Sequence, residues 1–249
     1  MIVSFVQTKG GTGKSTLALN TAFSRQIKNR FNSIALVELD PQGSLKNWWI
    51  QREEEGLGAQ NVSFHHISST QKAVFQSGIK TIAAHNELII MDIPGESTGK
   101  LHTRFACAFS DLVIIPMRTS TNDELAFADN LYPIIREITT VAPKKRNTFH
   151  VLPAFTHPQS NKEKLIEYFE DILPKHVGCL KVVYPHRSIY ENFNRDGMNL
   201  KEYAGSVRQN KRYAAQASRA VADIENISKT ITSLLEKNNG RAQKKKKTR

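Results

Sequence analysis

The sequence predicts an α/β fold of three layers, in which a mostly parallel central sheet is covered by helices on both faces. Short apolar, β-rich runs alternate with helix-length segments along the chain, which is the pattern of βαβ crossovers. The runs Leu88–Met91 and Leu112–Ile115 are continuously apolar, as strands covered on both faces should be. At 249 residues, the chain is long enough for one large domain with a sizeable core.

The alternation places each element in order. We expect strands at residues 2–7, 33–39, 62–67, 87–92, 111–116, 147–153 and 180–184. We expect helices at residues 14–29, 43–54, 70–84, 98–109, 121–140, 160–175 and 199–237. No internal repeat or linker divides the chain, so we expect one domain over residues 1–237. Residues 238–249 have the composition of a disordered basic tail.

Composition excludes several classes of protein. No apolar run approaches the roughly 20 residues that a membrane span needs. Residues 2–6 are apolar, but Lys9 and glycines follow, so we expect no signal peptide. Cys107 and Cys179 have no metal-type spacing and are interpreted as free thiols of a reducing cytoplasm. We therefore expect a cytoplasmic protein.

The charge of the chain is strongly positive. The net charge is +12, and six of the cations lie in the last nine residues. A basic chain favours polyanions, with nucleic acid first and an anionic membrane surface second. A solubilising charged terminus remains an alternative interpretation of the tail.

A phosphate-binding loop follows the first predicted strand and opens the first predicted helix. Three glycines allow the backbone to wrap tightly and turn its N–H groups toward phosphate oxygens. Lys14 is placed to reach the β- and γ-phosphates, and the Ser15 hydroxyl to bind Mg²⁺. The pattern predicts a P-loop nucleotide-binding fold with ATP and Mg²⁺ as ligands. The predicted nucleotide-binding residues are Lys9, Gly10, Gly11, Thr12, Gly13, Lys14, Ser15 and Thr16.

Two aspartates end predicted strands. Asp92 follows an apolar strand and precedes Pro94 and Gly95, a Walker B pattern in which the carboxylate holds Mg²⁺ directly or through a water molecule. Asp40 follows the second strand. Since ligands lie outside the carboxyl ends of parallel strands, Asp40 is expected to point toward the phosphate loop. A helix N-cap is the alternative role for Asp40.

One departure from the general P-loop pattern indicates a family. The first position of the loop is Thr8 rather than glycine, and a second lysine, Lys9, follows it. This resembles the deviant Walker A box of the ParA/MinD superfamily of ATPases. The resemblance implies that ATP closes a homodimer in which Lys9 reaches the phosphates bound by the partner. It also implies catalytic roles for Lys9, Lys14 and Asp40, with Asp40 orienting the attacking water.

The resemblance extends over about residues 1–210. The run Asp40–Trp48 resembles the DPQ box and following helix of small ParA partition ATPases, and Ser110–Pro116 resembles a strand of that family. Arg187–Gly197 is similar to a stretch near its C-terminus. Because the first strand begins at residue 2, we expect the short form, without an N-terminal helix-turn-helix domain. The strand ending Phe155-Thr156 lacks the asparagine that often contacts adenine, so no base contacts are assigned.

The resemblance implies an ATP-dependent switch that partitions or positions plasmid or chromosomal DNA. It would bind nucleoid DNA without sequence preference and be released when a ParB-like, centromere-binding adaptor stimulates hydrolysis. An assistant of conjugative DNA transfer shares every motif and stays open as an alternative. A MinD-like membrane switch is the weaker alternative, since the chain ends in basic residues rather than an apolar amphipathic helix. The candidate DNA contacts are Arg208, Lys211, Arg212, Arg219, Lys244, Lys245, Lys246 and Lys247.

Three further features are given structural interpretations. The apolar stripe Ile224, Ile227, Ile231 and Leu234 is expected to dock the last helix on the core. Trp48 is expected in the core. His65 and His66 have no acidic or cysteine partners nearby in the sequence, so metal binding there is not expected.

Overall fold

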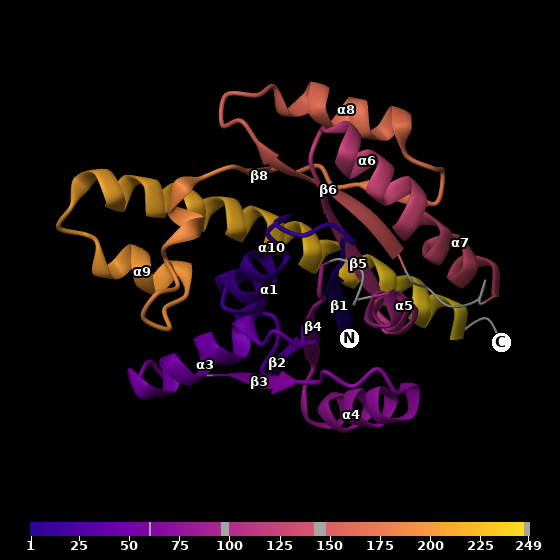
Figure 1. Ribbon diagram of the computed structural model, residues 1–249, viewed down its shortest axis with the longest axis horizontal. Coiled ribbons are helices and arrows are strands. Elements are labelled where there is room, and N and C mark those ends of the chain that lie inside the picture. Colours follow the sequence, from indigo (N-terminus) through magenta and orange to yellow (C-terminus); the bar gives the residue numbers. More distant parts are fainter. Residues whose placement is uncertain (60, 96–99, 142–147, 247–249) are drawn as a thin grey trace.

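A parallel sheet forms the centre of the molecule (Figure 1). The computed structural model describes residues 1–59, 61–95, 100–141 and 148–246, with side chains as far as residue 238. The strands are β1 (Ile2–Phe5), β2 (Ile34–Glu38), β3 (Val62–His66), β4 (Leu88–Asp92), β5 (Leu112–Met117), β6 (Thr148–Thr156), β7 (Val177–Cys179) and β8 (Tyr184–Pro185). Their order is β3-β2-β4-β1-β5-β6-β7, with β8 paired to β6. All of these pairings are parallel.

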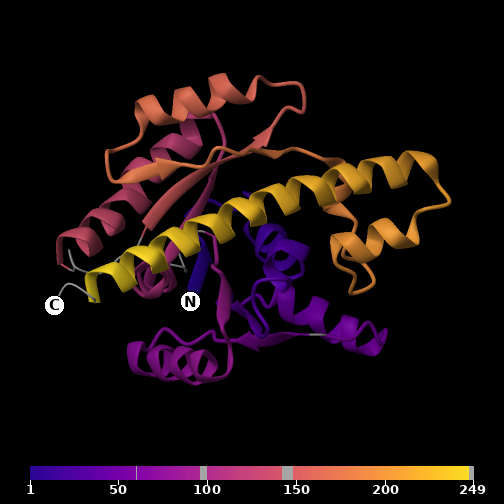
Figure 2. The ribbon, with the colours of Figure 1, turned by 180° about the vertical axis from the view of Figure 1, so that it is seen from behind.

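Helices cover both faces of this sheet. They are α1 (Lys14–Ala22), α2 (Arg25–Lys28), α3 (Ser44–Glu54), α4 (Lys72–His85), α5 (Lys100–Phe109), α6 (Thr121–Ala126), α7 (Tyr132–Val141), α8 (Lys162–Ile172), α9 (Leu200–Ser206) and α10 (Lys211–Lys246). A π-helical segment, η2 (Phe127–Leu131), joins α6 to α7, and a 3₁₀ turn, η3 (Ser188–Glu191), precedes α9. One apolar core lies under α1, α2, α3, α9 and α10, and the other under α4, α5, α7 and α8. This confirms the three-layer α/β fold. Figure 2 shows α10 crossing the back of the molecule.

Strand β1 lies at the centre of the sheet between β4 and β5. Val3 and Phe5 face one core and are fully buried, and Phe5 pairs with Asp92 of β4 and Ile114 of β5. The chain leaves β1 for β2 and β3 on one side and later enters β5, β6 and β7 on the other. A parallel sheet binds its ligand outside the carboxyl ends at such a switch point. The loop after β1 therefore occupies the central position of the site.

The strand expected at residues 180–184 is wrong. The structure has β7 at Val177–Cys179 and β8 at Tyr184–Pro185, separated by a connection. β7 pairs earlier in the chain than expected, with Gly178 opposite His150 of β6. A Cβ atom at Gly178 would come within 2.6 Å of the His150 ring. A side chain at residue 178 would therefore require the His150 ring to move.

Polar caps divide two of the long helices that we expected. The segment 14–29 ends at Ala22 and restarts at Arg25, because the Ser24 hydroxyl accepts the Ile27 amide. The segment 199–237 is likewise split into α9 and α10, since the Asn210 side chain accepts the Tyr213 amide at the start of α10. The segment 121–140 is helical but contains η2. Short polar side chains compete well for free helix-end amides.

The C-terminal helix continues past the domain boundary that we expected near residue 238. The backbone of α10 is helical as far as Lys246, which agrees with the high helix propensity of alanine, glutamine, arginine and lysine. Its apolar stripe packs on the core as expected, with Ile224, Ile227, Ile231 and Leu235 buried. Leu234 is only partly buried. Among the described residues, no helix is long and apolar enough to cross a membrane.

Arg52 joins α3 to the C-terminal half of the chain. Its side chain is 1% exposed and forms an ion pair with Glu202 of α9 at 2.6 Å. The guanidinium also donates to the carbonyls of Leu57, Gly58 and Gly197. It lies over the rings of Phe23 and Trp48, and both tryptophans of α3 are largely buried. Every strong donor of this buried cation therefore has a partner.

We expect Arg52→Ala to lower the free energy of unfolding by about 3 kcal/mol, because it leaves buried carbonyls and Glu202 without their cation. Urea unfolding followed by circular dichroism measures this change. Arg30→Ala is the matched control, since Arg30 pairs with Glu236 at the surface and its loss should cost less than about 1 kcal/mol. Equal losses in the two variants would contradict the structural role of Arg52.

Candidate nucleotide site

The phosphate loop runs from Thr8 to Gly13 between β1 and α1, and Lys14, Ser15 and Thr16 begin α1. Gly11 and Gly13 have φ angles of 66° and 78°, which a side chain would strain. Gly13 also has no room for one, because a Cβ atom would lie 2.9 Å from Tyr184 and 3.2 Å from Phe155. Gly13 is the N-cap of α1 and offers no side-chain acceptor. The first amides of α1 therefore point into the loop, as an anion site requires.

The Lys14 side chain lies against this loop. It is largely buried, and its Nζ donates to the Lys9 carbonyl at 3.2 Å. The loop after β4 passes directly against it, since a Cβ atom at Gly95 would lie 3.0 Å from the Gly10 Cα and 3.2 Å from the Lys14 Nζ. The Lys14 ammonium therefore lies between the phosphate loop and the loop after β4.

Asp92 ends β4 beside the loop and is 1% exposed. Burial raises the pKa of this carboxyl to about 7, although a hydrogen bond from Ser15 and the charge of Lys14 lower it. Its Oδ1 is buried and has no hydrogen-bond partner among the described residues. An oxygen pair of this kind, the Asp92 carboxylate and the Ser15 hydroxyl, fits Mg²⁺, a hard cation that prefers oxygen ligands. The structure thus brings together the two predicted metal-binding residues.

Asp40 lies at the same edge, after β2. The Leu39 amide donates to the Asp92 carbonyl at 2.9 Å, so the ends of β2 and β4 lie side by side. The Asp40 Oδ1 accepts the amide of Gln42 at 2.9 Å, and the His66 Nε2 lies 2.9 Å from the Asp40 carbonyl. The negative charge of Asp40 also contributes to the raised pKa of Asp92. The contact from His66 to the Asp40 carbonyl links the end of β3 to the loop that carries Asp40.

Lys9 is held by a residue that we did not predict. Its Nζ forms a 2.6 Å ion pair with Asp123 of α6, whose side chain is fully buried, whereas the Lys9 side chain is 37% exposed. Asp123 also accepts the amide of Arg118 and the Ser120 hydroxyl. Burial raises the pKa of Asp123, but the bonds from Lys9 and the Arg118 amide outweigh it and hold the pKa below its usual range. In the sequence, the pattern Ser120-x-x-Asp123 indicates only the start of a helix, with Asp123 in its first turn.

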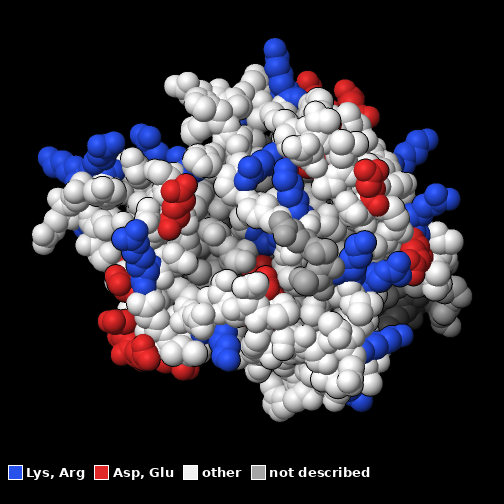
Figure 3. Space-filling model, in the orientation of Figure 1, with Lys and Arg blue, Asp and Glu red and all other residues white. Residues whose placement is uncertain are grey.

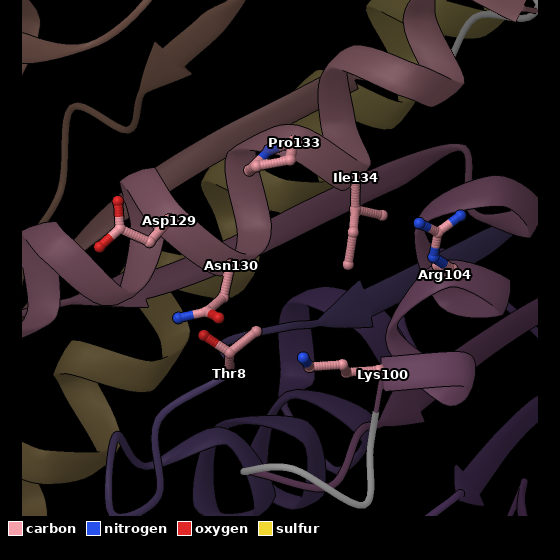
Figure 4. A pocket seen from close by; sticks show the side chains of 7 residues that line it. All are labelled: Thr8, Lys100, Arg104, Asp129, Asn130, Pro133 and Ile134. Atoms are coloured by element: carbon pink, nitrogen blue, oxygen red, sulfur yellow. The ribbon is translucent and has the colours of Figure 1, made fainter.

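A cavity of about 560 Å³ adjoins the outer side of the loop (Figure 4). It lies between α5 and the η2–α7 helix, and Lys9, Lys14, Asp40 and Asp92 are not among its lining residues. Figure 4 shows the Lys100 amine directed toward Thr8 and Asn130, with Ile134 pointing into the cavity. The Thr8 hydroxyl donates to the Ala126 carbonyl just before η2. The phosphate loop is thus bonded directly to the helix that borders this cavity.

The predicted DNA contacts fall into two groups at opposite ends of α10. Arg208, Lys211, Arg212 and Arg219 are exposed near α9 and the start of α10, where lysine and arginine side chains gather at one end of the molecule (Figure 3, left). For Lys244, Lys245 and Lys246 the structure describes only the backbone, and Lys247 lies outside the described residues. At 1.5 Å per residue, Arg219 and Lys244 are separated by about 38 Å along α10.

The fold and the site together define a P-loop protein that binds a nucleoside triphosphate. Residues 3–246 match the model of the CobQ/CobB/MinD/ParA nucleotide-binding domain family, CbiA. The chain therefore belongs to that family and is a nucleotide-binding protein of the ParA/MinD type.

Known proteins similar to the chain agree with this assignment. The chain is 32% identical over 93 residues to the maintenance of carboxysome distribution protein A of Gloeobacter kilaueensis, a match that covers 37% of this chain and 38% of that protein. Two solved structures share the fold at 12% identity and a TM-score of 0.64. The match to the ATP complex of a Cyanothece McdA variant covers 93% of this chain and 96% of that one. The match to the ParA protein of pNOB8 covers 95% and 99%.

We expect Asp92→Asn to stabilise the nucleotide-free protein above neutral pH. The pKa of Asp92 rises from 3.8 to about 7 on folding, so the folded chain binds a proton that the unfolded chain has lost. Stability of the natural protein should therefore fall as pH rises from about 4 to 7 and level off above, by up to about 4 kcal/mol from three pKa units. Urea unfolding in EDTA at several pH values would show the variant without this decline. Parallel pH profiles for the two proteins would contradict the assignment.

Proposed function

We propose that this chain is an ATP- and Mg²⁺-dependent switch that dimerises with ATP and partitions or positions DNA. The observation that carries the proposal is the pair of lysines in one phosphate loop, with Asp40 and Asp92 at the ends of neighbouring strands. The fold shared with a plasmid ParA protein supports this interpretation. A ParB-like adaptor bound to the cargo would stimulate hydrolysis and release the switch from DNA.

In the proposed cycle, Lys14 acts in its own chain and Lys9 in the partner. Lys14 is largely enclosed within the phosphate loop, whereas Lys9 lies at the loop surface on Asp123. A second cation supplied across a dimer would stabilise charge on the transferring phosphoryl group, as an arginine finger does. Lys9 must leave Asp123 to do so. Hydrolysis would then depend on dimerisation.

Asp40 is the proposed residue that orients the attacking water. Its carboxylate is fixed by the Gln42 amide at the edge shared with Asp92. When bound, Mg²⁺ would neutralise charge on the β- and γ-phosphates. Asp40 would act beside the γ-phosphate, with Asp92 and Ser15 holding the cation.

The exposed basic residues at the start of α10 are the proposed DNA-binding surface. Phosphate contacts made by such side chains give affinity without sequence preference. A MinD-like membrane switch is less favoured, because the apolar stripe of α10 is buried against the core as far as Leu235. A second candidate function is positioning of a cargo other than DNA, which the similarity to a carboxysome distribution protein favours.

Replacing Lys14 and replacing Lys9 should affect different steps, ATP binding and dimerisation respectively. Lys14→Ala should weaken ATP binding about 100-fold, because the phosphates lose a charge-assisted contact made within the chain. Lys9→Ala should bind ATP with nearly unchanged affinity but fail to dimerise. Titration of a fluorescent ATP analogue measures binding, and light scattering after size exclusion measures the dimer. A Lys9→Ala protein that dimerises with ATP and hydrolyses it normally would refute the proposed role in the partner.

The basic surface should be identified by its salt dependence. Replacing Arg208, Lys211 and Arg212 together by alanine should flatten the slope of log K against log salt by up to about 2.7, or 0.9 for each phosphate contact. Fluorescence anisotropy with random duplex DNA and a non-hydrolysable ATP analogue measures the slope. Lys162, Lys164 and Lys175, exposed on and beside α8, provide a control of equal charge. A truncation of residues 241–249 tests the tail separately, and equal slopes in all variants would exclude both basic groups.

A further inference from the structure

The Arg118 side chain lies directly against the phosphate loop. Arg118 follows β5 at the carboxyl edge of the sheet, next to β1. Its Nη2 donates to the Gly11 carbonyl at 2.5 Å, and its backbone amide donates to the Asp123 Oδ2 at 3.1 Å. Asp123 therefore holds both the Lys9 ammonium and the backbone from which Arg118 extends.

The Arg118 guanidinium packs on the face of the Phe155 ring. The guanidinium carbon lies 4.4 Å from the centre of the Phe155 ring, a distance at which a cation is attracted to an aromatic face. Among the described residues, Phe155 is the one non-glycine residue with a positive φ, 51°. Such a conformation costs about 1–3 kcal/mol and is found most often at functional sites. It places the ring against Gly13 and under Arg118.

The Arg118 guanidinium is partly buried, yet no carboxylate neutralises it among the residues whose side chains are described. Four others form ion pairs with carboxylates: Arg30, Arg52, Arg104 and Arg187. Arg118 has no carboxylate at ion-pair distance among the residues whose side chains are described, and its buried Nε has no hydrogen-bond partner there. A guanidinium with free donors beside a phosphate loop is suited to bind a phosphate group.

The sheet order indicates which part of the nucleotide Arg118 meets. Asp92 and Asp40 follow β4 and β2, on one side of β1, and mark the end of the site where Mg²⁺ and the γ-phosphate belong. Arg118 follows β5, on the opposite side of β1. We infer that Arg118 is a nucleotide-binding residue that contacts the α-phosphate, held in place by Phe155. The inference rests on the nucleotide-binding part of the proposed function and not on its DNA-binding part.

The test compares Arg118→Gln with the natural protein. Glutamine removes the charge, and its amide nitrogen lies only where the arginine Nε does, so the bond from Nη2 to the Gly11 carbonyl is lost as well. The dissociation constants of ATP and ADP should both rise about tenfold, the effect of one charge-assisted bond. The turnover number at saturating ATP should stay within about twofold, because a contact equal in ground and transition states changes binding alone. Phe155→Leu should shift both constants in the same direction by less.

Controls separate the possible failures. Arg136→Ala removes an exposed charge from α7 and should bind nucleotide normally. Unchanged ATP and ADP affinities in Arg118→Gln would show that Arg118 only braces the loop, and the inference would be wrong. A fall in turnover with a loss confined to ATP would place Arg118 at the γ-phosphate and also overturn it. If Lys14→Ala binds as tightly as the natural protein, the nucleotide site itself is wrongly assigned.

Discussion

The site depends on one geometric constraint, the parallel order of strands around β1. Because β4 and β5 flank β1 in parallel register, their carboxyl ends open on the same edge as the phosphate loop. Asp92 and Arg118 therefore reach opposite sides of one loop without any specific contact between them. The close packing of Gly95, Tyr184 and Phe155 against the loop glycines follows from the same convergence, since three connections crowd into a small space.

Charges of both signs are concentrated at this edge, and burial makes each of them expensive unless it is paired. Glu38 is the fully buried last residue of β2 and accepts two amides at the start of α3. These bonds offset only part of the effect of burial, which raises its pKa. Asp123 is neutralised by Lys9. Burial raises the pKa of Asp92, and the hydrogen bond from Ser15 and the charge of Lys14 offset only part of that effect.

The sequence was sufficient for the features that depend on local patterns. The glycine-rich loop, the apolar strands β4 and β5 and the acids that end β2 and β4 all have direct sequence signals, and the structure places them together. The residues that we missed depend on tertiary contacts. In the sequence, Asp123 is an ordinary acid at a helix start, and only the fold places it beside Lys9. Arg118 is an ordinary loop residue in the sequence, and only the fold places Phe155 of β6 against its guanidinium. The split of α9 from α10 instead depends on a local contact that we did not recognise, the Asn210 side chain that accepts the Tyr213 amide.

The Lys9–Asp123 pair connects this electrostatic arrangement to the proposed dimer. If Lys9 leaves for a partner's phosphates, Asp123 stays fully buried with only neutral donors, the Arg118 amide and the Ser120 hydroxyl. An isolated buried carboxylate is costly, so a lysine contact across the dimer must outweigh the loss. The phosphates of a bound triphosphate carry enough negative charge to compete, whereas an empty partner site does not. Under the proposed function, the buried aspartate would therefore make dimer closure selective for the nucleotide-bound state.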